Sequence, residues 1–185
     1  MKRLASSLTS PPLVLGFVAI LAYGLLIPQL GFYWDGLAIS WIRYQLGPEA
    51  MAQYFSSNRP VWGLLYQFTT RLLPQVPIYW QVFALFWRWV TGLLVWVILR
   101  ELFPERPRFA LGTALLFLLY PGFNQQWGAF LYSHFFIVLG FFLLSIYLML
   151  RARKGASGCG HRLPCFSPRS ICGCTSISSR LKPRG

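Results

Sequence analysis

Three side chains of this sequence stand out as able to do chemistry, because reactive residue types are scarce in it. Asp35 is the only aspartate, and it follows an apolar run directly, beside Phe32 and Trp34. A carboxylate that is partly withdrawn from water suits the work of a general base, so Asp35 is the candidate catalytic residue. The alternative is an acid that offsets the positive end of the helix following it, without any catalysis.

Two arginines are the candidate substrate-binding residues. Arg59 precedes Pro60 outside the apolar runs, and a guanidinium at a membrane surface can hold a lipid phosphate through two parallel hydrogen bonds. The alternative for Arg59 is an anchor whose charged end extends into water. Arg88 lies near the middle of a long apolar run, where a charge faces the bundle interior or a cavity. The alternative for Arg88 is a structural pairing inside the bundle.

The composition sets the class of fold that must position these residues. The chain has 185 residues, of which 56% are hydrophobic and 11% charged, and its mean hydropathy is +0.51. This is too apolar for an ordinary soluble domain, and the many aromatic residues suit the interfacial belts of a membrane protein. We therefore predict an all-α fold, a polytopic membrane helix bundle with about four transmembrane helices.

The predicted spans are the apolar segments 12–30, 77–99, 109–123 and 129–150. The first is long for a signal peptide and has no clear cleavage site, so we interpret it as a span. The third segment has only 15 residues, but it must also cross the membrane if the basic loops MKR, RELFPERPR and RARK are to lie on the same side. Because basic loops favour the cytoplasm, we expect a multi-pass protein of the cell membrane with a cytoplasmic N-terminus.

This topology places residues 31–76 outside the cytoplasm, in a loop apolar enough to lie on the membrane. Within it, a helix is predicted from the apolar residues at helical spacing, which are Val61, Leu64, Leu65, Phe68 and Leu72. We expect Asn58 to cap this interfacial helix and Pro74 to end it. A weaker helix at 34–46 puts a second set of apolar residues on one side, namely Trp34, Leu37, Trp41 and Tyr44.

The charge and the cysteines divide the chain into a membrane domain, 1–154, and a tail, 155–185. Residues 1–150 hold nine Lys or Arg and four acids, a net charge of +5, whereas residues 151–185 hold eight Lys or Arg and no acid. The excess is thus in the tail, so we do not expect a nucleic-acid partner. The tail's cysteines, Cys159, Cys165, Cys172 and Cys174, lack the paired spacing of a zinc site, so no metal is predicted. We interpret the tail as a disordered, frameshifted extension; attraction to anionic lipid is the alternative.

The order of these features resembles a known enzyme family. The sequence F-Y-W-D-G follows the first span, N-R-P opens the second loop helix, and Y-P-G-F-N-Q-Q follows the third span. Over about residues 5–150 this is similar to the N-terminal part of the C-type (GT-C) polytopic membrane glycosyltransferases. Within them it looks most like bacterial members of the protein mannosyltransferase and lipid A aminoarabinose transferase superfamily.

The resemblance implies an enzyme without a cofactor that takes a sugar from a polyprenyl-phosphate carrier at the outer face of the membrane. The sugar passes to an acceptor hydroxyl, usually with inversion, and the position matching the family's acid is Asp35. Many relatives carry two adjacent acids, whereas this sequence has Asp35 and Gly36. Family members have many more spans, so the chain corresponds to less than half of one and is expected to be inactive alone.

The alternative function is a small non-enzymatic multi-pass membrane protein, either a transporter or an assembly subunit. An acid in an external loop favours the enzyme, whereas paired broken helices in repeated halves would favour a transporter. The sequence contains no internal repeat that we can detect.

Overall fold

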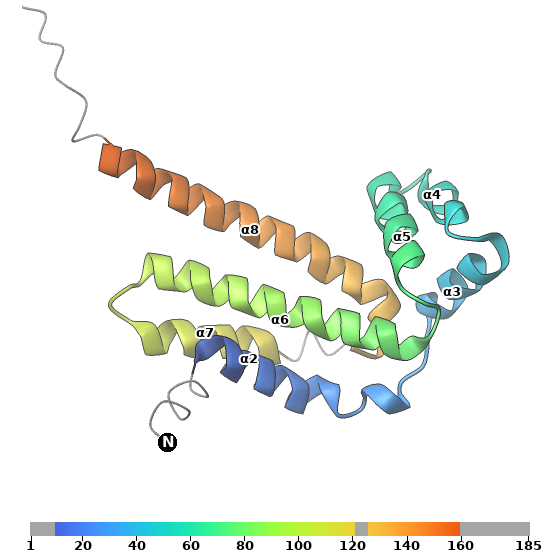
Figure 1. The fold of residues 1–185 in the computed structure, drawn as a ribbon, viewed down its shortest axis with the longest axis horizontal. Helices are drawn as coiled ribbons and strands as arrows, with labels where there is room; N and C mark the ends of the chain where they lie inside the picture. The colour runs from blue at the N-terminus through green and yellow to red at the C-terminus, as the bar shows by residue number, and fades with distance from the viewer. Residues whose placement is uncertain (1–9, 121–125, 160–185) are drawn as a thin grey trace, which may run out of the picture.

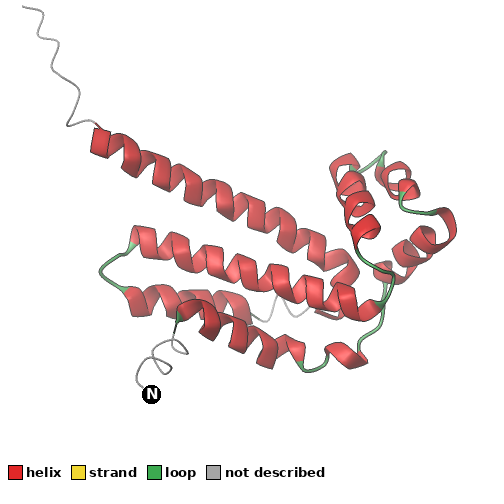
Figure 2. Cartoon of the chain, in the orientation of Figure 1, coloured by secondary structure: helices red, strands yellow, loops and turns green. Residues whose placement is uncertain are grey.

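A computed structural model describes residues 10–120 and 126–159, with side chains to residue 154. Every regular element within these ranges is a helix, as Figure 2 shows, so the all-α prediction is confirmed. The long bundle is built from α2 (Pro11–Ala19), continued by η1 (Ile20–Gly24) and η2 (Ile27–Gln29), and from α6 (Pro77–Leu102), α7 (Pro107–Leu119) and α8 (Ala129–Cys159). A short helix, η4 (Gln126–Gly128), leads into α8.

Among the described residues, three helical segments are long and apolar enough to cross a membrane. They are Pro11–Gln29, Pro77–Leu102 and Gln126–Lys154, which correspond to the predicted first, second and fourth spans. The protein is therefore a membrane protein with a helical bundle. The predicted third span appears as α7, whose 13 residues reach about 20 Å against a hydrocarbon core of about 30 Å.

The path of the chain nevertheless carries α7 from one end of the bundle toward the other. Successive bundle helices run in alternate directions in Figure 1, and α7 starts at the end where α6 finishes. By Gln126 the chain is back at the opposite end, where the Gln126 side-chain amide donates to the backbone carbonyl of Gln81, near the start of α6, over 2.9 Å. The segment 107–126 therefore joins the two ends, as a fourth crossing requires.

One end of the bundle is basic. The last turn of α6, the α6–α7 loop and the end of α8 meet there and bring together Arg100, Arg106, Arg108, Arg151, Arg153 and Lys154. Glu101 ties two of these elements together, because its carboxylate accepts from both Arg151 and Lys154. Two of the basic loops that the sequence places on one side of the membrane, RELFPERPR and RARK, thus lie at one end of the structure, and the third, MKR, lies outside the described residues.

The opposite end carries a group of three short helices, which we call the α3–α5 module (Figure 1). It comprises α3 (Asp35–Leu46), α4 (Glu49–Phe55) and α5 (Pro60–Leu72). The two predicted loop helices are therefore present, and the seven-residue α4 was not expected. Gly47, with φ +84°, ends α3 in a conformation that side chains other than glycine's rarely allow.

The predicted cap of α5 was wrong. The N-cap is Arg59 rather than Asn58, and no side chain bonds to the exposed N–H groups of this terminus. Pro60 begins the helix, because its missing N–H costs nothing in the first turn. The two threonines of α5, Thr69 and Thr70, are buried against the protein, while Val61, Phe68 and Leu72 are exposed.

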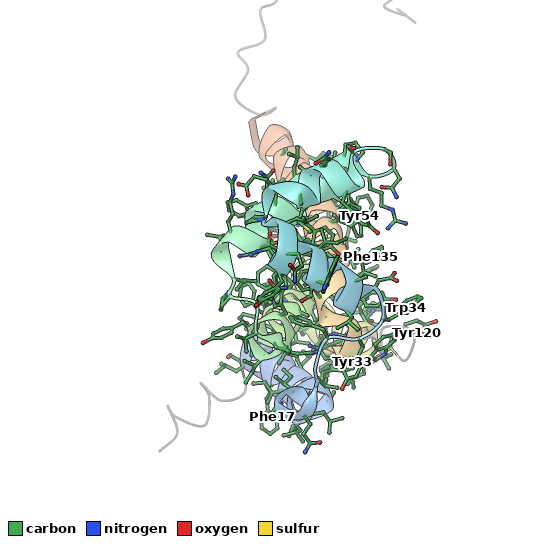
Figure 3. The ribbon with its side chains drawn as sticks, turned by 90° about the vertical axis from the view of Figure 1, so that its right-hand side faces the viewer. Phe17, Tyr33, Trp34, Tyr54, Tyr120 and Phe135 are labelled. Atoms are coloured by element: carbon green, nitrogen blue, oxygen red, sulfur yellow. The ribbon has the colours of Figure 1, made fainter. Side chains whose placement is uncertain are left out.

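This inverted arrangement fits a helix that lies against lipid. The stripe of α3 predicted from the sequence is likewise exposed, at Trp34, Leu37, Trp41 and Tyr44. Exposed aromatic side chains also gather along one edge of this end, where Figure 3 labels Tyr33, Trp34 and Tyr120. Aromatic residues are typical of the level where a membrane meets water, and the cluster of basic residues in the α6–α7 loop and at the end of α8 lies at the other end of the bundle.

The helix α8 extends to Cys159, five residues past the boundary that composition placed at residue 154. The rest of the predicted tail, including Cys165, Cys172 and Cys174, lies outside the described residues.

The two ends predict opposite sides of the membrane. In a variant whose four native cysteines are Ser, a cysteine at Gln53 in α4 should react with an impermeant thiol reagent in intact cells. A cysteine at Glu105, in the basic α6–α7 loop, should react only after the membrane is opened. Labelling of both sites in intact cells would contradict an odd number of crossings between them.

The close packing of α4 on α5 gives a second prediction. A Cβ on Gly63 would lie 3.0 Å from the Ala52 Cα, so Gly63→Ala must push the two helices apart. We expect a loss of about 1 to 3 kcal/mol in thermal unfolding of the purified protein. Gly112→Ala in α7 is the matched control, since a Cβ there meets nothing within 4 Å and should be neutral or stabilising. Equal effects at the two sites would contradict the packing.

Candidate functional site

The module meets the bundle through a buried aromatic cluster centred on Tyr66 of α5. The Tyr66 side chain has 0% of its surface exposed. Its ring stacks on Phe55 of α4 at 5.0 Å between centroids, and it contacts the His134 ring of α8 at 3.7 Å and Phe130 at 5.8 Å. Trp80 of α6 packs on Phe130 in turn, at 4.2 Å. One tyrosine therefore touches elements of both the module and the bundle.

A polar contact reinforces this junction. The Nε2 atom of His134 lies 2.9 Å from the hydroxyl oxygen of Thr69 in α5. The other ring nitrogen, Nδ1, lies 3.1 Å from the carbonyl oxygen of Phe130 and 3.2 Å from the hydroxyl of Ser133. Both nitrogens of this fully buried imidazole thus have polar neighbours, which is the usual condition for a buried polar group.

Asp35 is brought to this cluster by its neighbours in sequence. Phe32 meets Phe130 edge to face at 5.4 Å, and a Cβ on Gly36 would lie 3.3 Å from the Phe130 Cβ. Asp35, between them, is the first residue of α3 and is exposed. Trp34 precedes it with φ +52°, a strained conformation for a side chain of this size. The position of Asp35 also satisfies the alternative of an acid at a helix N-terminus.

The contact of Gly36 with α8 is tight. A Cβ at this position would lie 3.3 Å from the Phe130 Cβ, so any side chain there would require α3 and α8 to shift by a few tenths of an ångström. Glycine therefore suits the position that follows Asp35.

Arg59 approaches the same cluster from the start of α5. It is exposed, and its guanidinium carbon lies 5.5 Å from the centre of the Trp62 ring. Trp62 is fixed against α8 by an edge-to-face contact with Phe135, at 4.5 Å. The arginine is therefore held at the junction between the module and the bundle.

Asp35 and Arg59 both act electrostatically on the Tyr66 hydroxyl. Burial raises the pKa of Tyr66 far above its ordinary value; the positive charge of Arg59 opposes this shift and the negative charge of Asp35 adds to it. The hydroxyl is buried, and no group in residues 10–120 or 126–159 hydrogen-bonds to it. The charges of an acidic and a basic side chain thus act on one buried hydroxyl that has no hydrogen-bond partner in the described part of the chain.

Arg88 does not join this group. It is 1% exposed inside the bundle, where its guanidinium carbon lies 3.8 Å from the centre of the Tyr23 ring and 4.8 Å from that of Phe136. Its surroundings are those of the structural pairing that the sequence left as the alternative to substrate binding. A cation over two aromatic faces is stabilised by their electron density even without water.

No family model, no curated protein and no solved structure matches this chain. The function must therefore be inferred from the residues of the site. Of the motif Y-P-G-F-N-Q-Q, residues 121–125 lie outside the described residues.

The part of the chain that the structure describes holds no group of three or more His, Cys, Asp or Glu side chains placed to bind a metal ion. His161 and the tail cysteines beyond Cys159 lie outside that part.

Two residues of the site were missed from the sequence. His134 carried a signal, because an ionisable side chain within an apolar span is a functional or structural candidate. Tyr66 gave no such signal, because the sequence does not distinguish it from the other eight tyrosines of the chain. Only the packing of α5 against α8 shows that it is buried at the junction.

Proposed function

We propose that the chain is part of a membrane glycosyltransferase that moves a sugar from a polyprenyl-phosphate carrier to an acceptor hydroxyl at the outer face. The observation that carries the proposal is that Asp35 and Arg59 both lie at the junction between the module and the bundle: Asp35 stands between Phe32 and Gly36, which contact Phe130, and Arg59 lies over Trp62. The two are 24 positions apart and lie on separate helices. Both are at the end of the bundle opposite the basic α6–α7 loop, where such a carrier would present its sugar.

In the proposed transfer reaction, Asp35 and Arg59 have separate roles. The Asp35 carboxylate takes the proton of the acceptor hydroxyl while the oxygen of that hydroxyl attacks the anomeric carbon of the sugar. The bond between that carbon and the phosphate oxygen breaks, and the electron pair leaves with the carrier phosphate. Arg59 neutralises the charge that develops on the phosphate, and Asp35 then releases its proton to water.

The lipid part of the substrate also suits this end of the molecule. The outward faces of α3 and α5 are apolar and continuous with the membrane-spanning bundle, so a carrier whose chain lies in the bilayer can reach the junction without leaving it. A small non-enzymatic membrane protein remains the second function, supported by the place of Asp35 in the first turn of α3.

Asp35→Asn tests the catalytic role. The amide keeps the size of the side chain but cannot take a proton, so sugar transfer by the enzyme containing this membrane domain should fall by about 10² to 10⁴. Glu49→Gln is the matched control, because Glu49 is also an exposed acid at the first residue of a module helix. Transfer should survive it. Unchanged transfer in Asp35→Asn would reduce Asp35 to a helix-terminus acid, whereas no transfer by the wild-type enzyme would favour the non-enzymatic function.

Arg59→Ala should act on the donor rather than on proton transfer. Removing a charged hydrogen-bond donor to phosphate should raise the donor KM about tenfold or more. Arg71→Ala is its control, since Arg71 is an exposed arginine of the same helix that pairs with Glu49. An equal rise in both variants would show a general effect of charge on the membrane surface.

A further inference from the structure

The unpartnered hydroxyl of Tyr66 needs a physical explanation. A buried hydroxyl that makes no hydrogen bond costs roughly 1 to 3 kcal/mol, and such groups are few in folded proteins. This one belongs to a side chain with 0% of its surface exposed. Its neighbour Thr69 bonds to backbone carbonyls and lies against His134, so of the polar side chains Tyr66, Thr69 and His134 at this junction only the tyrosine has no hydrogen-bond partner.

The ring cannot turn its hydroxyl to another partner. It is held between Phe55, stacked nearly parallel at 6°, and His134, at a centroid distance of 3.7 Å. Phe130 confines it further. A partner must therefore come to the hydroxyl, and the hydroxyl is pre-positioned for it.

The local charge decides the chemistry of that partner. The charged side chain that the geometry places beside the Tyr66 ring is Arg59, whose guanidinium carbon lies 5.5 Å from the centre of the Trp62 ring, which in turn lies 6.4 Å from that of Tyr66. A partner that binds between this cation and the hydroxyl is favoured if it is an anion. Burial also keeps the phenol protonated, so the group donates a hydrogen bond and does not act as an acid.

We propose that the Tyr66 hydroxyl donates a hydrogen bond to the phosphate group of the ligand that Arg59 binds, and so positions that phosphate. This rests on the proposed function and adds Tyr66 to it as a positioning residue. Because the outer face of the module is apolar, the phosphate that reaches this site is one linked to a lipid. Because the ring is fixed and the hydroxyl is buried, the phosphate can reach it only when the side chains that cover it move.

The test is the binding of farnesyl phosphate, a short polyprenyl phosphate, to the purified full chain in detergent. Tyr66→Phe keeps the ring and its stacking and removes only the hydroxyl. We expect its affinity to fall about tenfold, which corresponds to about 1.4 kcal/mol. Tyr54→Phe, which removes the hydroxyl of an exposed tyrosine in α4, should bind as the wild type does.

Stability without ligand provides a second readout. If the hydroxyl forms a hydrogen bond only with the ligand, Tyr66→Phe removes no hydrogen bond from the unliganded protein, and the unliganded Tm should be unchanged or higher. The rise of Tm with farnesyl phosphate should then be smaller than in the wild type. A lower unliganded Tm would show that the hydroxyl is already satisfied inside the protein and would overturn the proposal.

Two further probes identify the source of the phosphate. Binding of farnesyl phosphate but not of inorganic phosphate or phosphatidylglycerol vesicles supports a polyprenyl carrier. A Tyr66-dependent affinity for inorganic phosphate alone overturns the lipid source. Equal affinity of Tyr66→Phe and wild type for farnesyl phosphate overturns the role of Tyr66 and leaves the proposed function standing. If the wild type binds none of the three probes, the donor site fails and the proposed function fails with it.

Discussion

The contact of Tyr66 and Thr69 in α5 with His134 in α8 is the constraint on which the rest of the structure depends. The outer stripes of the α3–α5 module are apolar and turned away from the protein, so they contribute nothing to its docking on the bundle. The module is docked by an aromatic contact of 3.7 Å and a polar contact of 2.9 Å to His134, by the packing of Phe130 against Gly36 and Phe32, and by the edge-to-face contact of Trp62 with Phe135. The positions of Asp35 and Arg59 follow from these contacts, because Asp35 lies between Phe32 and Gly36 and Arg59 lies over Trp62.

A histidine suits this junction better than an apolar ring of similar size. Its two nitrogens lie near Thr69 on one side and near Phe130 and Ser133 on the other, which fixes both the tilt of the ring and the register of α5 against α8. In a low-dielectric surrounding such contacts are directional and strong when all partners are present. The opposite end of the bundle uses a different device, in which Glu101 pairs with Arg151 and Lys154 at the water-exposed ends of α6 and α8.

The long helices and the exposed stripes could be predicted because they depend on local properties, namely apolar run length and helical spacing. The helix α4 was missed because its seven residues carry no span-like signal and it forms by packing on α5 at Gly63. Asn58 was assigned as a cap on residue type alone, whereas the chain enters the helix one residue later, at Arg59. Asp35, Arg59 and Arg88 were chosen for their charge, but only the docked module separates the pair at the junction from the arginine enclosed by Tyr23 and Phe136.

The most direct test of this account is hydrogen exchange of a His134→Leu variant in lipid nanodiscs. Leucine fills much of the same volume but removes the ring contact with Tyr66 and the polar contact with Thr69. If this contact holds the module in place, amides of α3 to α5 should lose protection while those of α6 and α7 keep theirs. Unchanged protection across residues 35–72, or an equal loss in every helix, would contradict the account.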